Sequence, residues 1–198
     1  MELTARFSEA LAYAFRLHAL QRRKVSGVPY IAHLLSVAAI ALEHGANEDE
    51  AIAALLHDAV EDQGGAPVGE EIRRRFGQVV ADIVDGCTDA DTVPKPPWRE
   101  RKETFLAWLP QSARSVHLVC AADKLHNARS LLDDYRARGE SLWDHFSGGR
   151  AGTLWYYRAV VAALESAGGG PPEGKKLVEK LDRVVAELER LAAAQSRD

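Results

Sequence analysis

Apolar residues recur at intervals of three and four along almost the whole chain of 198 residues. This is the period of one face of an α-helix, and no stretch shows the sustained alternation that is typical of a half-buried β-strand. We therefore expect an all-α fold of about eight to ten helices. The expected helices span residues 4–21, 33–44, 48–59, 69–76, 79–86, 99–109, 115–134, 151–166 and 175–194.

The length of the chain suits one helical domain. We expect this domain to span residues 1–166, and residues 167–198 to form a hinge rich in Gly and Pro followed by a helix that packs on the same domain. An apolar stripe on that last helix supports the packing. Its members are Leu177, Leu181, Val184, Leu188 and Leu191.

Two further segments are expected to be loops. Residues 88–98 contain three prolines and two Asp residues, which favours a surface position. Residues 140–152 are interrupted by Gly and contain Trp143 and Phe146, so this segment is interpreted either as a lid or as a simple connection.

The composition excludes several classes of protein. Twenty-five Lys and Arg against 29 Asp and Glu give a net charge of −4, which argues against nucleic-acid polymers as partners. Cys87 and Cys120 lack the spacing of a disulfide framework or a zinc-binding pair, so we expect two buried thiols. Neither a secretory signature nor an apolar run of about 20 residues is evident. We therefore expect a cytoplasmic protein that does not enter membranes.

The most unusual local feature is a group of ionisable side chains at the end of an apolar helix, in the run AALLHDAVED at 53–62. Each of these side chains is costly to bury without a partner. His57 and Asp58 can converge on one ion that lies beyond the helix end. Glu61 and Asp62 follow one turn later, close enough to act on a water molecule at that ion.

Further metal ligands are expected from other helices, because two ligands do not hold a hydrolytic cation. His33 begins a helix after the sequence PYIA, and Asp123 interrupts an apolar run at 116–125. Asn127 lies one turn after Asp123 on the same helix face. Two imidazoles and two carboxylates suit Mn²⁺, Fe²⁺ or Zn²⁺ with room for water.

These residues also carry a resemblance to a known family. The spacing of His33, the pair His57 and Asp58, and Asp123 resembles the HD superfamily. Five ordered blocks resemble the hydrolase domain of the RelA/SpoT family, and within it the small alarmone hydrolases such as the metazoan SpoT homologue. The blocks are RRK at 22–24 with GVPYIAH at 27–33, AALLHDAVED at 53–62, RFG at 75–77, VDGCT at 84–88 and ADKLHN at 122–127.

The resemblance covers roughly residues 8–165 and implies both a reaction and its residues. The implied activity is removal of the 3′-pyrophosphate from guanosine tetra- or pentaphosphate, without synthetase activity because the chain ends where that domain would begin. Mn²⁺ is the implied cation, with ligands His33, His57, Asp58 and Asp123. The acids implied to position and deprotonate water are Glu61 and Asp62. The implied nucleotide contacts are Arg23, Lys24 and Asn127, and Arg101 and Lys102 are weaker candidates for binding phosphate.

Several alternatives stay open at this point. An HD hydrolase of this kind could act on adenosine 3′-pyrophosphate, on the 2′-phosphate of NADPH or on a deoxynucleotide, and a non-catalytic nucleotide sensor is a further alternative. The intact set of ligands and acids disfavours the sensor. The basic run at 22–24 could equally be a solvated helix end. The sequence does not indicate an oligomeric state.

Other side chains also have two interpretations. The aromatic run at 155–157 could stack on a base, although such a cluster more often belongs to the core. The acidic residues could form a second cation site, although a solvated edge is favoured; they are Asp82, Asp85, Asp89 and Asp91.

Overall fold

The computed structural model describes residues 2–90, 94–167 and 172–195. Across these ranges the regular structure is helical, with one isolated antiparallel bridge between Arg22 and Pro29, and the predicted all-α fold is confirmed. The elements are α1 (Ala5–Leu17), α2 (Ile31–Glu43), α3 (Glu48–Leu56), α4 (Ala59–Gln63), α5 (Ala66–Phe76), α6 (Gln78–Cys87), α7 (Trp98–Trp108), α8 (Arg114–Arg138), α9 (Gly149–Ser166) and α10 (Pro172–Gln195), with the short 3₁₀ helices η1 (Leu109–Gln111) and η2 (Gly139–His145).

Helix α3 lies at the centre of the N-terminal half, where it packs against α1, α2, α6 and α8. Its residues from Ala51 to Leu56 are buried, and small alanine side chains let the neighbouring helices approach closely. The helix begins in a capping box, in which Asn47 accepts a hydrogen bond from the Glu50 amide at 2.9 Å and Glu50 accepts one from the Asn47 amide at 2.8 Å. The start of this helix is therefore fixed by local sequence.

The end of α3 differs from the sequence prediction. The helix expected at 48–59 stops at Leu56, and α4 starts at Ala59. Asp58 lies between them with φ −95° and ψ 0°, in the bridge region of the backbone map. The break turns the chain at His57 and Asp58, the residues that the sequence singles out.

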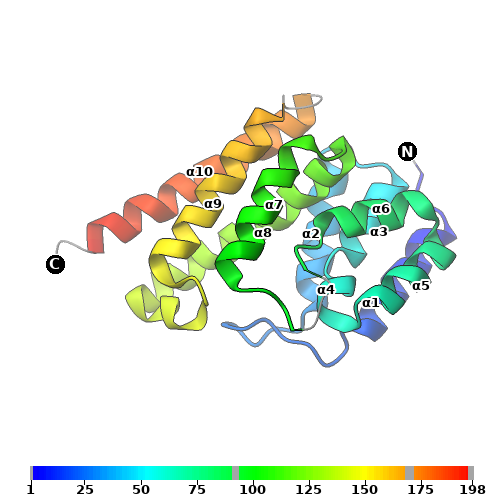
Figure 1. Ribbon diagram of the computed structural model, residues 1–198, viewed down its shortest axis with the longest axis horizontal. Helices are drawn as coiled ribbons and strands as arrows, with labels where there is room; N and C mark the ends of the chain where they lie inside the picture. The colour runs from blue at the N-terminus through cyan, green and yellow to red at the C-terminus, as the bar shows by residue number, and fades with distance from the viewer. Residues whose placement is uncertain (1, 91–93, 168–171, 196–198) are drawn as a thin grey trace.

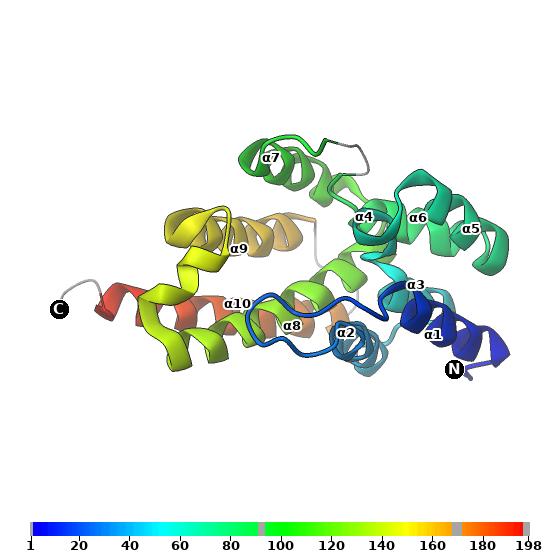
Figure 2. The ribbon, with the colours of Figure 1, turned by 90° about the horizontal axis from the view of Figure 1, so that it is seen from below.

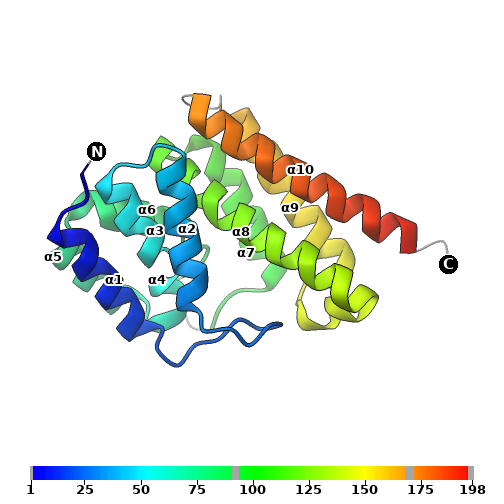
Figure 3. The same cartoon turned by 180° about the vertical axis from the view of Figure 1, so that it is seen from behind.

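The C-terminal half is built around the long helix α8. Helix α10 packs along α8 and α9, and Figures 1 and 3 show it running beside both helices on one side of the molecule. The predicted apolar stripe of α10 is confirmed at Leu177, Leu181 and Leu188, which are buried. The other buried residues of this helix are Val185 and Ala192, in place of the predicted Val184 and Leu191. The domain boundary at residue 166 stays a prediction, and residues 168–171 of the expected hinge lie outside the described residues.

Residues 140–152 are a packed connection. Most of the segment belongs to η2 and to the first turn of α9. Leu142 and Trp143 are buried, and the Trp143 ring lies 5.2 Å from that of Tyr135. This burial leaves the lid interpretation without support. Among the described residues, no helix is both long and apolar enough to cross a bilayer.

Candidate metal centre and active site

Three segments that are distant in sequence bring the predicted metal ligands together. His33 lies in the first turn of α2, His57 and Asp58 lie between α3 and α4, and Asp123 lies in the middle of α8. Helices α2, α3 and α8 pack against one another, as Figure 2 shows near the centre of the view. The four side chains therefore meet where these helices converge.

The four side chains surround a common point. His57 Nε2 lies 3.1 Å from Asp58 Oδ2 and 3.5 Å from Asp123 Oδ1. His33 Nε2 lies 3.5 Å from Asp58 Oδ2 and 3.3 Å from Asp123 Oδ1. Potential ligand atoms of His33, His57 and Asp58 all fall within 4.8 Å of one another. Two imidazole nitrogens and two carboxylate oxygens are thus close enough to share one ion.

The other nitrogen of each imidazole has its own partner. His57 Nδ1 lies 2.9 Å from the Ala54 carbonyl oxygen, and His33 Nδ1 lies 2.8 Å from Nδ1 of His126. Burial and the neighbouring His33 and Arg23 lower the pKa of His126 to about 4, which keeps His126 neutral at pH 7. Within the described residues both Nε2 atoms are buried without a hydrogen-bond partner. Such buried nitrogens, which face carboxylate oxygens without making a hydrogen bond, fit a metal, because metal-ligating histidines usually bind a protein group through the other nitrogen.

The electrostatics of the centre favour an added positive charge. Burial works against a charged His57, but the carboxylates of Asp58 and Asp123 outweigh it and hold its pKa well above the usual value. Burial would likewise raise the pKa of both carboxyls, yet His57 beside Asp58 and Lys124 beside Asp123 hold each pKa well below its usual value. The same two carboxylates would stabilise the charge of a divalent cation bound between these side chains.

Neighbouring side chains hold the two carboxylates in place. Tyr30 donates a hydrogen bond to Asp58 Oδ2 at 2.6 Å. Lys124 donates one to Asp123 Oδ2 at 2.6 Å, and Asn127 donates another to Asp123 Oδ1. Asn127 is predicted from the sequence, whereas Tyr30 and Lys124 are not predicted as partners of the ligands, although they lie within the blocks at 27–33 and 122–127.

The two predicted catalytic acids have different surroundings. Glu61 accepts a hydrogen bond from Lys95 at 2.9 Å, and Asp62 accepts one from Gln21 at 2.8 Å. Burial and the Asp89 carboxylate raise the pKa of Glu61, against the opposing effect of Lys95. Burial and the Asp58 carboxylate raise the pKa of Asp62. Both acids are therefore better proton acceptors than ordinary carboxylates once they are ionised.

Two of the predicted nucleotide contacts are linked to Asp123 by hydrogen bonds. Arg23 donates a hydrogen bond to Asn127 Oδ1 at 2.8 Å, and Asn127 in turn contacts Asp123. Lys24 follows Arg23 and is exposed. Arg23 and Asn127 are thus joined to the centre by direct contacts.

One acidic residue is placed differently from the prediction. The side chain of Asp89 is only 4% exposed and pairs with Arg101 and Lys102, so it is not part of a solvated edge. Asp89 can be buried because two cations from α7 offset the cost of burying its carboxylate. Asp91 lies outside the described residues.

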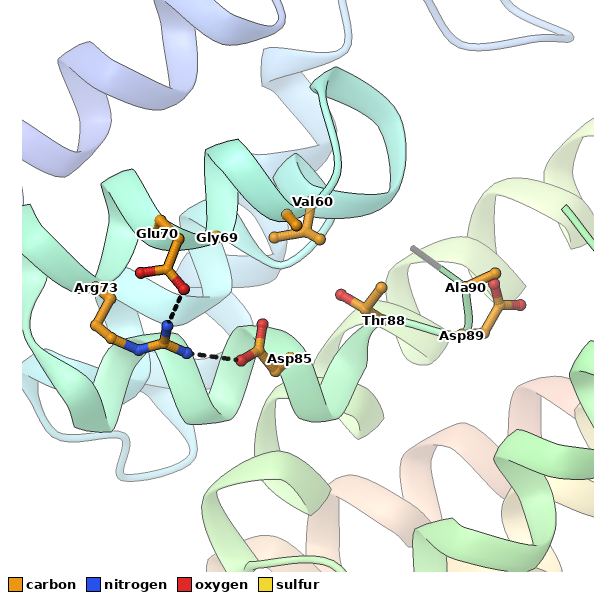
Figure 4. Close-up of a pocket in the computed structure, with 9 residues that line it drawn as sticks. Val60, Gly69, Glu70, Arg73, Asp85, Thr88, Asp89 and Ala90 are labelled. Atoms are coloured by element: carbon orange, nitrogen blue, oxygen red, sulfur yellow. Dashed lines mark hydrogen bonds and ion pairs between the residues drawn. The ribbon is translucent and has the colours of Figure 1, made fainter. Parts of the chain in front are cut away.

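A pocket of about 350 Å³ is lined by residues of α4, α5 and α6 and by the residues that follow α6 (Figure 4). On one wall, Arg73 pairs with Glu70 and lies 3.4 Å from Asp85. None of the four converging His and Asp side chains lines this pocket, so it does not contain the centre. The lining residues are Val60, Ala66, Gly69, Glu70, Arg73, Asp85, Thr88, Asp89 and Ala90.

A helical domain that brings two His and two Asp side chains together is typical of HD-domain proteins, and the comparison with family models supports this class. The HD domain family matches residues 10–154, and the chain belongs to that family. An HD domain implies a divalent metal ion, and His33, His57 and Asp58 offer ligand atoms close enough together to hold one.

Among HD-domain proteins, the chain is similar to relatives that are named as hydrolases of guanosine 3′-pyrophosphates. The guanosine-3′,5′-bis(diphosphate) 3′-pyrophosphohydrolase of Xenopus tropicalis is 44% identical over 126 residues, which cover 62% of this chain and 68% of the relative. Its Homo sapiens counterpart is 41% identical over 131 residues, covering 64% and 70%. The solved structure of a metazoan orthologue of SpoT that hydrolyses ppGpp matches with a TM-score of 0.77 and 29% identity, covering 94% of this chain and 97% of that one.

Proposed function

We propose that this protein is a metal-dependent hydrolase that removes the 3′-pyrophosphate from guanosine tetra- or pentaphosphate. The observation that carries the proposal is the convergence of two buried, unpartnered imidazole nitrogens and two carboxylates on one point. The relatives support the substrate, since the similar proteins of Xenopus tropicalis and Homo sapiens bear the name of that activity. We propose His33, His57, Asp58 and Asp123 as the ligands.

Manganese is the proposed cation. Mixed nitrogen and oxygen ligands suit Mn²⁺, and they also accommodate Fe²⁺ or Zn²⁺. A divalent cation, when bound, lowers the pKa of a coordinated water towards about 7. The partners of the ligands, Tyr30 on Asp58 and Lys124 on Asp123, keep the carboxylates in a fixed orientation before the ion arrives.

In the proposed reaction, Glu61 and Asp62 hold the attacking water and take its proton. The water oxygen forms a bond to the phosphorus attached to the ribose 3′ oxygen, and the bond from that phosphorus to the 3′ oxygen breaks. The 3′ oxygen takes up a proton and pyrophosphate leaves with the new oxygen. The nucleoside 5′-diphosphate remains from the tetraphosphate and the 5′-triphosphate from the pentaphosphate. Arg23 and Lys24 offset the negative charge of the nucleotide, and Asn127 contacts it through its amide.

Two substitutions separate metal binding from acid–base chemistry. Asp58→Asn removes a ligand charge, so metal content and turnover should fall together. Glu61→Gln should retain the metal while kcat falls by roughly 10²–10⁴-fold, the usual share of general acid–base catalysis. Metal analysis of the purified variants and release of pyrophosphate are the measurements. Normal turnover by Glu61→Gln would show that its assigned role is wrong.

A panel of nucleotides distinguishes the alternative functions. The proposal predicts pyrophosphate release from guanosine tetraphosphate at a higher kcat/KM than any release from adenosine 3′-pyrophosphates, NADPH or deoxynucleotides. Release of single phosphate from NADPH as the fastest reaction would favour a 2′-phosphatase. Tight nucleotide binding with no product would favour a sensor. A cytoplasmic location and the lack of nucleic-acid polymers as partners stay predictions.

A further inference from the structure

Three cations that the mechanism above does not use lie beside the proposed metal centre. Arg101 and Lys102 come from α7 and Lys124 from α8, and their side chains are only 14%, 16% and 17% exposed. Asp89 joins the first two, with Arg101 Nη1 2.6 Å from Asp89 Oδ1 and Lys102 Nζ against the other carboxylate oxygen. We call Arg101, Lys102 and Lys124 the cation cluster.

The cation cluster extends from a proposed metal ligand to a proposed catalytic acid. Lys124 contacts Asp123 at one end, and at the other end Arg101 Nη1 lies 3.7 Å from Glu61 Oε1. Between them, the Nζ atoms of Lys102 and Lys124 lie over the ring of Tyr156, at 4.8 and 5.8 Å from its centroid. The cluster therefore adjoins the place where the water and the reacting phosphorus must meet.

The charges of the cluster are not balanced by its own carboxylate. Asp89 pairs with both Arg101 and Lys102. The other carboxylates in reach are Glu61, 3.7 Å from Arg101, and Asp123, which pairs with Lys124, and we assign these two to the attacking water and to the metal. Burial and the charge of Lys124 lower the pKa of Lys102, which is the sign of crowded cations. Partly buried cations without enough counter-charge are costly unless an anion joins them.

We propose that the cation cluster binds the pyrophosphate group of the substrate and of the released product, and that Asp89 positions Arg101 and Lys102 for this task. The forked guanidinium of Arg101 and the point charges of the two lysines suit the oxygens of two linked phosphates. This inference rests on the proposed function and deepens it, because it explains how the site distinguishes a diphosphate from a single phosphate.

Inorganic pyrophosphate and inorganic phosphate are the probes for the test. Isothermal titration of the manganese-loaded protein should show tighter binding of pyrophosphate than of phosphate. Lys102→Met should weaken pyrophosphate binding by roughly tenfold or more, because it removes a hydrogen-bond donor that is charged and mostly buried. It should leave the affinity for guanosine 5′-diphosphate within about twofold. Lys102→Arg, which keeps the charge, should retain most of the affinity for pyrophosphate.

Lys176→Met is the matched control, since Lys176 is exposed on α10, and it should bind pyrophosphate like the wild type. If Lys102→Met does not fold, as judged by circular dichroism, Arg101→Gln provides the same readout. Unchanged pyrophosphate affinity, or an equal loss for phosphate and pyrophosphate, would overturn the inference. A protein that binds pyrophosphate through Lys102 but does not hydrolyse guanosine tetraphosphate would refute the proposed function and leave this subsite intact.

Discussion

The surroundings of the Glu61 carboxylate change its pKa in opposite directions. Burial and the Asp89 carboxylate raise the pKa, whereas the hydrogen bond and the charge of Lys95 lower it. A base works only when it is ionised, so activity should be lost as the pH falls through this raised pKa. The acid limb of the pH–rate profile should therefore lie above the ordinary value for Glu, about 4.3.

Lys95→Met provides a direct test of this balance. The substitution removes an influence that lowers the pKa of Glu61, so the acid limb of kcat/KM should move to higher pH. Profiles measured across the acid range for Lys95→Met, Lys176→Met and the wild type check this expectation. An acid limb that stays in place, or that moves to lower pH, would contradict the assignment of Glu61 as the base.

The sequence predicts the site residues that belong to short motifs better than those that pair across the fold. His33, His57, Asp58 and Asp123 could be identified because ionisable groups in apolar helices are costly without partners. The burial of Asp89 could not, because its partners Arg101 and Lys102 lie on another helix and nothing in the local sequence indicates that pairing.

The break between α3 and α4 is the element-level feature that hydrophobic periodicity did not predict. The apolar pattern continues through Leu56 to Ala59 and Val60, so a continuous helix to residue 59 was expected. The backbone of Asp58 instead takes the bridge conformation, and the Asp58 carboxylate accepts a hydrogen bond from Tyr30. Tertiary contacts with α2 thus accompany a local conformation that periodicity alone does not indicate.

The contact of α6 with α8 is tested by Gly86→Ala. A Cβ atom at Gly86 would lie 2.6 Å from Val116 Cγ2 and 3.1 Å from the ring of Trp108. The substitution should lower the free energy of unfolding by about 1–3 kcal/mol, the usual cost of overpacking. Urea denaturation followed by circular dichroism is the measurement.

Gly69→Ala is the control for that experiment. Its Cβ would meet Val60 Cγ2 at 3.6 Å, an ordinary contact, so a helical alanine there should raise stability by about 0.5–1 kcal/mol. Equal effects of the two substitutions would show that the close approach of α6 and α8 is not what requires glycine at residue 86.

At the scale of the whole molecule, α10 is expected to contribute to the stability of the domain. Leu181 is fully buried within the main core cluster, together with residues of the N-terminal half. Leu181→Ala should destabilise the protein by about 2–5 kcal/mol in a single cooperative transition. A loss below about 1 kcal/mol, or a separate early transition, would mean that α10 folds independently and that residues 167–198 are not part of the same unit.

The order and type of the helices could be predicted from periodicity, but their packing could not. The stripe on α10 shows the reason, because the sequence placed Val184 and Leu191 in the core whereas Val185 and Ala192 are the fully buried residues. A helix face is a band wider than one row of side chains, and the neighbouring helices decide which edge of it is covered. In this protein α8 and α9 pack against α10 and determine which of its residues are buried.

The central claim is that three distant segments hold one divalent ion between two imidazoles and two carboxylates. Crystals grown with manganese, measured for anomalous scattering, test this claim directly. The account predicts one strong peak bonded to Nε2 of His33 and His57 and to carboxylate oxygens of Asp58 and Asp123. A peak at any other location, or a structure in which these side chains do not face a common ion, would contradict it.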